Sequence, residues 1–312
     1  MAYKSGFSNI EYFKNFNMGR ELEIAGEFIY ESAIKMKALS FVGNHFNVNT
    51  ILYNGAVGIE RLQKILLCMN MVSESELETP LKCLKEHNHI ILQNKIKEIF
   101  GITFNKNQIA LLELFRRYYD DFRYAEYQID YNETELCNML IDFINKRTGT
   151  SISIGAPFLE QDYRKMKSYF INLLGQISYK YYNEIWEKAN GLGLFTCEMS
   201  SDSNAAKIFY RREEEKLYDI LQIEEYAFKE FLIYLLSAKK KTKFLKFFKS
   251  LAVLDFDEYM IPEYLLDITN FKSSVLLNDF VEDAYTNFSR QELKERKEIL
   301  DLMSNSQVMW ED

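Results

Sequence analysis

The residue types best suited to chemistry are concentrated in the stretch ELFRRYYDDFRYAEY, from Glu113 to Tyr127. This stretch mixes arginine and tyrosine with acidic residues. Guanidinium groups bind phosphate oxygens through paired hydrogen bonds, and tyrosine rings stack on the bases of single-stranded nucleic acids. The stretch therefore predicts a site that binds phosphate or nucleic-acid bases.

A single helix through this stretch would align polar side chains at the edge of its apolar face, because residues three or four apart share a face. The predicted stripe consists of Arg116, Asp120, Arg123 and Tyr127. We expect Arg116 and Arg123 to act in catalysis. The side chains expected to bind RNA or phosphate are those of Arg117, Tyr124 and Tyr127.

The same arginines also have a purely structural interpretation. Arg116 with Asp120, and Arg117 with Asp121, have the (i, i+4) spacing of intrahelical salt bridges. Such pairs are common on solvent-exposed helix faces and contribute little stability. The two interpretations predict different surroundings for the arginine side chains. A binding site would bring them together in a groove, whereas intrahelical salt bridges would leave them exposed to solvent.

The chain has three histidines, His45, His87 and His89, all in its first third. We expect His87 to be a catalytic general acid or base, with His89 as the alternative. His45 lies in a polar loop that could close over the same site. The structural alternative for His87 is a histidine at the edge of the core. His87 and His89 point to different sides of a predicted helix and make a poor metal pair, so we expect no metal and no cofactor.

A second basic segment, AKKKTKFLKFFKSL at 238–251, interleaves lysines from Lys239 to Lys249 with phenylalanines. Its composition suits binding to nucleic acid or to an anionic membrane surface. The structural interpretation is a helix end with lysines near its negative pole and phenylalanines in the core. We favour the structural interpretation, because a run of charges usually forms a solvated face.

The composition predicts that helices position these residues. Only 3 prolines and 12 glycines occur among 312 residues, so few breaks interrupt helical segments. A net charge of −8 argues against nucleic-acid binding over the whole surface but permits local basic patches. We expect a mainly α fold, with a helical bundle, a second helical region and at most a short strand or hairpin.

Helical periodicity and capping signals predict five helices in the first half. They span about 19–39, 50–71, 79–100, 107–127 and 132–146. The segment RTGTSISIGAP at 147–157 is the strongest break and has the pattern of a short strand, so we place a domain boundary there. The expected domains are a helical bundle at 1–150 and a mainly helical region at 151–312. Residues 191–203 alternate apolar and polar types, which suggests a strand or hairpin.

The sequence predicts a cytoplasmic protein with no membrane partner. Its first residues lack the apolar core and cleavage site of a secretory signal. No apolar run approaches the roughly 18–20 residues that span a bilayer. Four cysteines lie far apart without a CxxC pair, which argues against a zinc ribbon or a redox motif.

Three successive segments resemble the HEPN superfamily of small helical bundles. They are GAVGIERLQKILL, EHNHIIL and RRYYDDFRY, within about residues 20–146. Families of this kind have a Gly-Ile-Glu-like turn with a nearby lysine, a histidine helix and a final arginine-rich helix. The resemblance implies an RNA-directed protein of prokaryotic defence or toxin type, commonly a metal-independent endoribonuclease. It also implies a homodimer that brings two Arg-x(4–6)-His motifs together.

This sequence departs from that motif. No histidine follows Arg116 or Arg117 by four to six residues, and Arg123 occupies the region where one is expected. A guanidinium cannot act as a base near neutral pH. Either His87, His89 or a tyrosine substitutes, or the domain binds RNA or a nucleotide without cutting it. The alternative function is a non-catalytic helical adaptor that binds a protein partner through a Tyr/Arg-rich surface.

Overall fold

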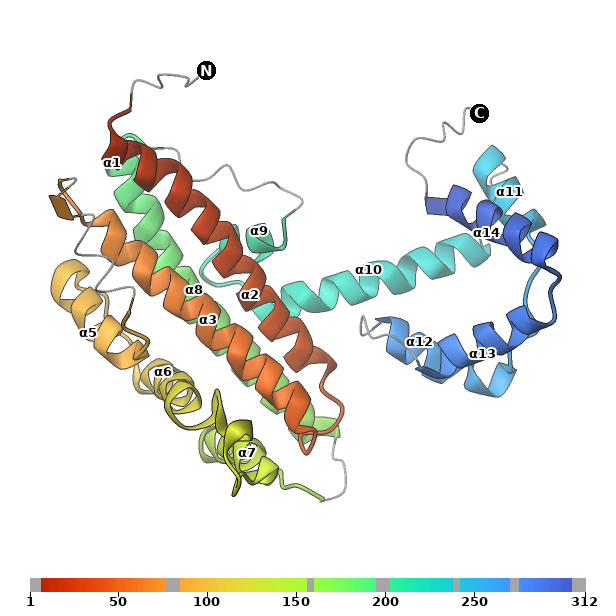
Figure 1. Ribbon diagram of the computed structural model, residues 1–312, viewed down its shortest axis with the longest axis horizontal. Coiled ribbons are helices and arrows are strands. Elements are labelled where there is room, and N and C mark those ends of the chain that lie inside the picture. The colour runs from red at the N-terminus through yellow and green to blue at the C-terminus, as the bar shows by residue number, and fades with distance from the viewer. Residues whose placement is uncertain are drawn as a thin grey trace. The chain divides into compact units, whose positions relative to one another are not determined.

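The computed structural model describes residues 7–73, 75–76, 85–155, 160–194, 203–237, 242–269 and 275–304. Within these ranges the regular elements are all helices, which confirms the mainly α fold class (Figure 1). The expected short strand at 147–157 does not form in its described part, which is a helix end followed by a turn. Most of the possible hairpin at 191–203 lies outside the described residues.

The chain divides into two compact units, Met1–Leu221 and Gln222–Asp312. In the first unit, three long helices pack together, and shorter helices lie along α3 (Figure 1). The long helices are α2 (Met18–Ala38), α3 (His45–Met69) and α8 (Glu160–Gly191). The shorter ones are α5 (His89–Phe100), α6 (Lys106–Arg117) and α7 (Glu133–Thr148). This unit also contains two shorter helices, α1 (Asn9–Tyr12) and α9 (Asn204–Phe209).

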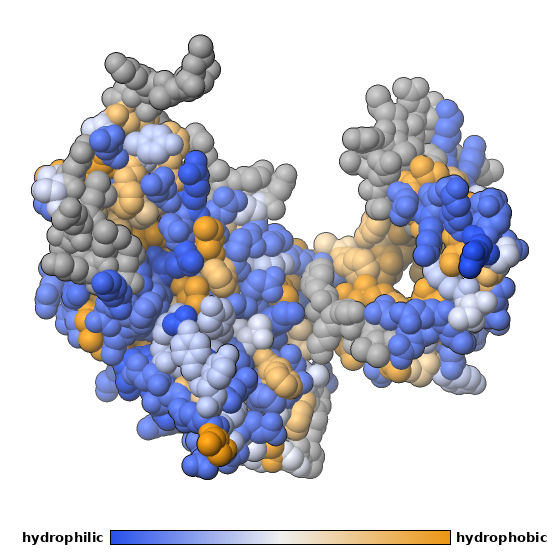
Figure 2. Space-filling model, viewed as in Figure 1, coloured by the Kyte–Doolittle hydropathy of each residue, from blue (hydrophilic) through white to orange (hydrophobic). Residues whose placement is uncertain are grey.

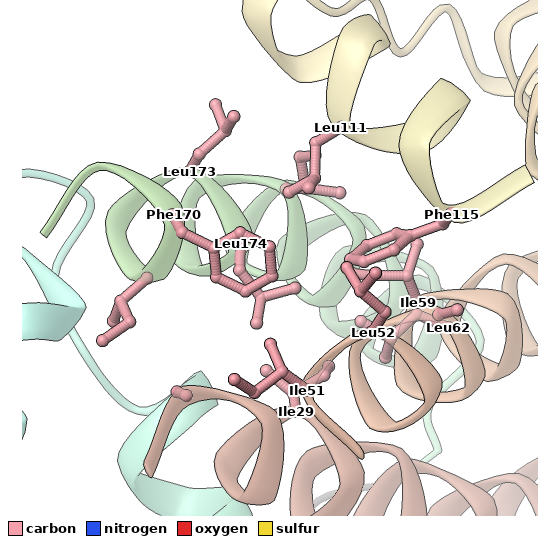
Figure 3. Close-up of a cluster of buried hydrophobic side chains, with 14 of the residues drawn as sticks. Ile29, Ile51, Leu52, Ile59, Leu62, Leu111, Phe115, Phe170, Leu173 and Leu174 are labelled. Atoms are coloured by element: carbon pink, nitrogen blue, oxygen red, sulfur yellow. The ribbon is translucent and has the colours of Figure 1, made fainter. Parts of the chain in front are cut away.

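The core of the first unit lies where α2, α3, α6 and α8 meet (Figure 3). Ile29, Ile59, Phe115, Phe170 and Leu174 are fully buried there. Burying a side chain of this size stabilises the fold by about 1.5–3 kcal/mol. Because α8 belongs to the same core, the break expected near residue 150 lies inside this unit, which ends at Leu221.

Two glycines allow α3 to pack closely on its neighbours. A Cβ atom on Gly58 would lie 2.6 Å from Ile29 Cγ1 and 3.0 Å from the Ala25 carbonyl oxygen, both on α2. A Cβ atom on Gly55 would lie 2.9 Å from the Phe115 ring of α6. Gly55 and Gly58 therefore serve helix packing, and both lie within the regular helix α3.

The prediction of one helix at 107–127 is wrong in its second half. α6 ends at Arg117, and Tyr118–Phe122 form a π-helical turn, η3, in which the Arg123 amide donates to the Tyr118 carbonyl at 2.9 Å. A 3₁₀ turn, η4 (Ala125–Tyr127), follows. A π-helical turn contains an additional residue, so it rotates every later side chain relative to a regular helix. The predicted single stripe therefore does not form.

Within the expected helix at 79–100, residues 85–88 are not helical. Asn88 has an extended backbone, and its side-chain oxygen accepts from the amides of Ile90 and Ile91, so α5 starts at His89. His87 lies in the non-helical segment before this cap. The predicted start at Thr79 and Pro80 lies outside the described residues.

The second unit consists of helices with few buried apolar side chains. They are α10 (Leu217–Ser237, which begins in the first unit), α11 (Lys243–Ser250), the 3₁₀ turn η5 (Glu258–Met260), α12 (Ile261–Thr269), α13 (Val275–Thr286) and α14 (Arg290–Ser304). Leu245 and Tyr264 are buried, while Phe231 and Leu236 are exposed. Figure 2 shows hydrophobic residues (orange) at the surface of this unit among hydrophilic ones (blue). In α11, Lys243, Lys246 and Lys249 are exposed; Lys239 to Lys241 lie outside the described residues.

Candidate ligand pocket

A cavity of about 430 Å³ opens beside the C-terminal half of α3, in the first unit. Its polar lining consists of Glu21, Glu60, Arg61, Lys64, His87 and Arg123. Its apolar and aromatic lining consists of Phe13, Met18, Tyr53, Val57, Ile65, Cys68 and Tyr119. Convergent polar groups on an apolar wall, in a cavity of this size, are typical of small-molecule and cofactor sites.

One face of α3 supplies most of this lining. Tyr53, Val57, Glu60, Lys64 and Cys68 succeed one another at intervals of three or four residues, so a regular helix places them on one side. Glu60 and Lys64 have the (i, i+4) spacing of a pair on an exposed helix face. The structure instead buries Glu60, which is only 7% exposed.

Glu60 is the centre of the polar cluster in the cavity. Lys64 Nζ donates to Glu60 Oε1 at 2.5 Å, and His87 Nδ1 donates to the same oxygen at 3.1 Å. The carboxylate thereby sets the orientation of the His87 ring. His87 Nε2 makes no hydrogen bond to any residue that the structure describes, and half of the side chain is exposed. This leaves Nε2 available to a ligand.

Tyr119 links His87 to Arg123. The His87 and Tyr119 rings are stacked with centroids 5.9 Å apart, and Arg123 Cζ lies 4.8 Å from the Tyr119 centroid. Burial, and then the negative charge of Glu60, raise the pKa of the Tyr119 hydroxyl, so the phenol stays neutral. Arg123 forms no ion pair within the described ranges, so its guanidinium remains free to pair with an anion.

Two π-helical turns border this cavity. Phe13 comes from η1 (Phe13–Asn17), and Tyr119 comes from η3. The first turn is anchored by Lys14, which is buried and donates to the Met71 carbonyl at 2.5 Å. Desolvation lowers the pKa of this lysine, against the opposing effect of Glu76. Single π-helical turns occur frequently at functional sites.

The cavity brings together only two of the predicted site residues, His87 and Arg123. Arg116 lies outside it and forms the predicted (i, i+4) ion pair with Asp120 at 2.6 Å. Glu113, which was not part of that prediction, also binds Arg116 at 2.5 Å. Arg117 lines a separate groove. Tyr124 and Tyr127 are 63% and 88% exposed and do not line the cavity.

The other two histidines have structural partners. His89 is fully buried, its Nε2 donates to the Ala56 carbonyl at 3.0 Å, and desolvation lowers its pKa. It belongs to a buried network in which Gln63 donates both to the His89 carbonyl and to Tyr181 Oη. His45 pairs with Glu133 at 3.2 Å and does not line the cavity.

The sequence interpretation missed Tyr119 and assigned no site role to Glu60 and Lys64. A signal existed for the second pair, because Glu60 and Lys64 continue the spacing of Tyr53 and Val57 along α3. Tyr119 had no such signal, since the π-helical turn changes its direction relative to α6.

A comparison with protein-family models, curated proteins and solved structures finds no match. No helix among the described residues is both long enough and apolar enough to cross a membrane.

Proposed function

We propose that this chain is an RNA-directed, HEPN-like protein that binds a phosphate of RNA in the cavity beside α3. Its activity would be that of a metal-independent endoribonuclease of prokaryotic defence or toxin type, or of a relative that binds RNA or nucleotide without cutting. A homodimer is part of the proposal.

The observation that supports the proposal is the meeting of His87 and Arg123 at Tyr119. His87 comes from the segment before α5 and Arg123 follows η3, yet both line one cavity and contact one ring. A positioned imidazole beside an unpaired guanidinium combines a proton acceptor with a phosphate-binding cation. Glu60 adds a carboxylate that orients the imidazole.

These groups suit cleavage by the neighbouring 2′-hydroxyl of the RNA. His87 Nε2 accepts the hydroxyl proton while the 2′-oxygen attacks phosphorus, and the bond from phosphorus to the 5′-oxygen breaks. The leaving oxygen takes a proton from water, which gives a 2′,3′-cyclic phosphate and a 5′-hydroxyl end. Arg123 stabilises the charge that develops on the phosphoryl oxygens.

The test is incubation of the pure protein with labelled total RNA and tRNA, with and without EDTA. We expect cleavage in EDTA, reduced about 10²-fold or more in His87→Ala and in Arg123→Ala. Arg116→Ala is the matched control, because Arg116 lies outside the cavity in ion pairs with Glu113 and Asp120. Equal activity in all three variants would refute the assignment to this cavity, and binding without cleavage would favour the non-cleaving relative.

One observation favours the alternative of a protein-binding adaptor. Tyr124, Tyr127 and Ile129 are strongly exposed next to one another in the segment after η3, and the rings of Tyr124 and Tyr127 are 6.4 Å apart. Exposed tyrosine is typical of protein interfaces. The adaptor predicts no cleavage, and unchanged RNA affinity in an Arg116→Ala/Arg123→Ala variant.

A further inference from the structure

A second groove, of about 240 Å³, lies between the C-terminal halves of α6 and α7. Ala110 and Leu114 of α6, with Met139 and Phe143 of α7, are its apolar lining. The residues share a spacing of three or four positions on each helix, so two regular helix faces form the walls. No residue lines both this groove and the cavity beside α3.

Both helices direct cations into this groove. They are Arg117 from α6, and Lys146 and Arg147 from α7. The acidic residues of the lining are Glu113 and Asp142, and Glu113 is already bound by Arg116 at 2.5 Å. The side chain of Arg117 is half exposed and lies 4.0 Å from Asp121, which is a weak, solvent-screened pair. The groove therefore has an excess of positive charge over available carboxylate.

Helix dipoles explain only part of this arrangement. Each of the three cations lies in the last turn of its helix, where a positive charge is favourable. Arg147 also donates to the Phe143 carbonyl at 3.1 Å and lies over the Phe143 ring. The helix dipole explains why each cation lies in the last turn of its own helix. It does not explain why the cations of two helices lie in the same groove.

We propose that the groove between α6 and α7 binds the phosphodiester backbone of a single-stranded nucleic acid through Arg117, Lys146 and Arg147. This inference deepens the proposed function and rests on it, since it provides the RNA with a second contact away from the cleavage cavity. Backbone contacts hold a strand in place without reading its sequence.

The experiment measures fluorescence anisotropy of a labelled 2′-O-methyl RNA oligonucleotide at several salt concentrations. This probe cannot be cut by attack of a 2′-hydroxyl, so binding is measured separately from cleavage. The groove variant is Arg117→Gln/Lys146→Gln/Arg147→Gln. The matched control removes the same charge from exposed positions elsewhere in the first unit, as Lys97→Gln/Arg164→Gln/Lys165→Gln. A double variant, Arg117→Gln/Lys146→Gln, retains the contacts of Arg147 with α7 and serves if the triple variant does not fold.

Each phosphate contact with a single strand contributes about 0.7 to the slope of log affinity against log salt. We expect the magnitude of this slope to decrease by about 2 in the triple variant and by about 1.4 in the double variant. The affinity for the oligonucleotide at low salt should decrease at least tenfold. Equal slopes in the groove and control variants would overturn the proposal, as would absence of binding by the unmodified protein. Inorganic pyrophosphate serves as a competitor for the labelled oligonucleotide. If pyrophosphate displaced the oligonucleotide fully when both supplied the same concentration of phosphate groups, the ligand would be a free phosphate, and the backbone assignment would be overturned. Binding without any RNA cleavage would overturn the endoribonuclease and leave the groove in place.

Discussion

Mild acid should destabilise this protein through His89. The imidazole is fully buried at the start of α5, against α3, and Nε2 donates to the Ala56 carbonyl at 3.0 Å. Nδ1 has no hydrogen-bond partner among the described residues. Desolvation lowers the pKa of His89, and the bond to Ala56 and the charge of Glu60 oppose this effect. The folded state therefore holds His89 neutral.

The magnitude follows from proton linkage. An unfolded histidine has a pKa of about 6.5, so between pH 6.5 and the lowered folded-state pKa the unfolded chain binds one more proton than the folded protein. Stability thus rises with pH across that window and is constant above it. If the folded state binds no proton at pH 5.5, the contribution lost between pH 7.5 and pH 5.5 is about 1.4 kcal/mol.

Urea unfolding at pH 7.5 and pH 5.5 tests this reasoning. His89→Gln keeps a side-chain donor for the Ala56 carbonyl but does not titrate. Between pH 7.5 and pH 5.5, the free energy of unfolding of this variant should therefore decrease by about 1.4 kcal/mol less than that of the unmodified protein. At ordinary urea sensitivity, this difference corresponds to a midpoint shift of about 0.5–1.4 M. His45→Gln is the matched control and should keep the full acid sensitivity, because it retains His89. An equal loss of stability in His89→Gln and the unmodified protein would refute the argument.

Three further predictions concern single positions. Gly58→Ala should destabilise the protein by up to about 2 kcal/mol in urea unfolding, since overpacking against α2 costs about 1–3 kcal/mol and helix propensity returns about 1 kcal/mol. Gly191→Ala is the control and should be neutral or stabilising, because the added Cβ atom meets open space. Asn88→Ala should cost about 1 kcal/mol by the same measurement, because it removes the N-cap of α5. Glu60→Gln should slow RNA cleavage about 10-fold or more, because the His87 ring loses the carboxylate that orients it. The double variant Glu60→Gln/His87→Ala should cleave RNA at the same rate as His87→Ala alone.

Much of the first unit could be predicted from the sequence because local signals and tertiary packing agree there. Apolar periodicity located α2 and α3 to within a few residues, and Asn132 was correctly placed at the start of α7. The composition, with few prolines and glycines, correctly predicted the mainly α class. In these segments the stripe of apolar residues that defines the helix is also the stripe that enters the core.

Which of the predicted site residues lie together could not be derived from the sequence, because side-chain direction depends on backbone geometry that a regular helix does not have. The π-helical turn at Tyr118–Phe122 separates Arg123 from Arg116, so that one lines the cavity and the other forms ion pairs outside it. The cap at Asn88 removes His87 from the helix that was expected to carry it.

The sequence by itself determined the helical class, the main helices of the first unit and the residue types available for chemistry. The tertiary structure decided which of those residues meet. Glu60, His87, Tyr119 and Arg123 come from α3, the segment before α5, η3 and the residue after it. Their convergence depends on how these segments pack, and local periodicity contains no information about that packing.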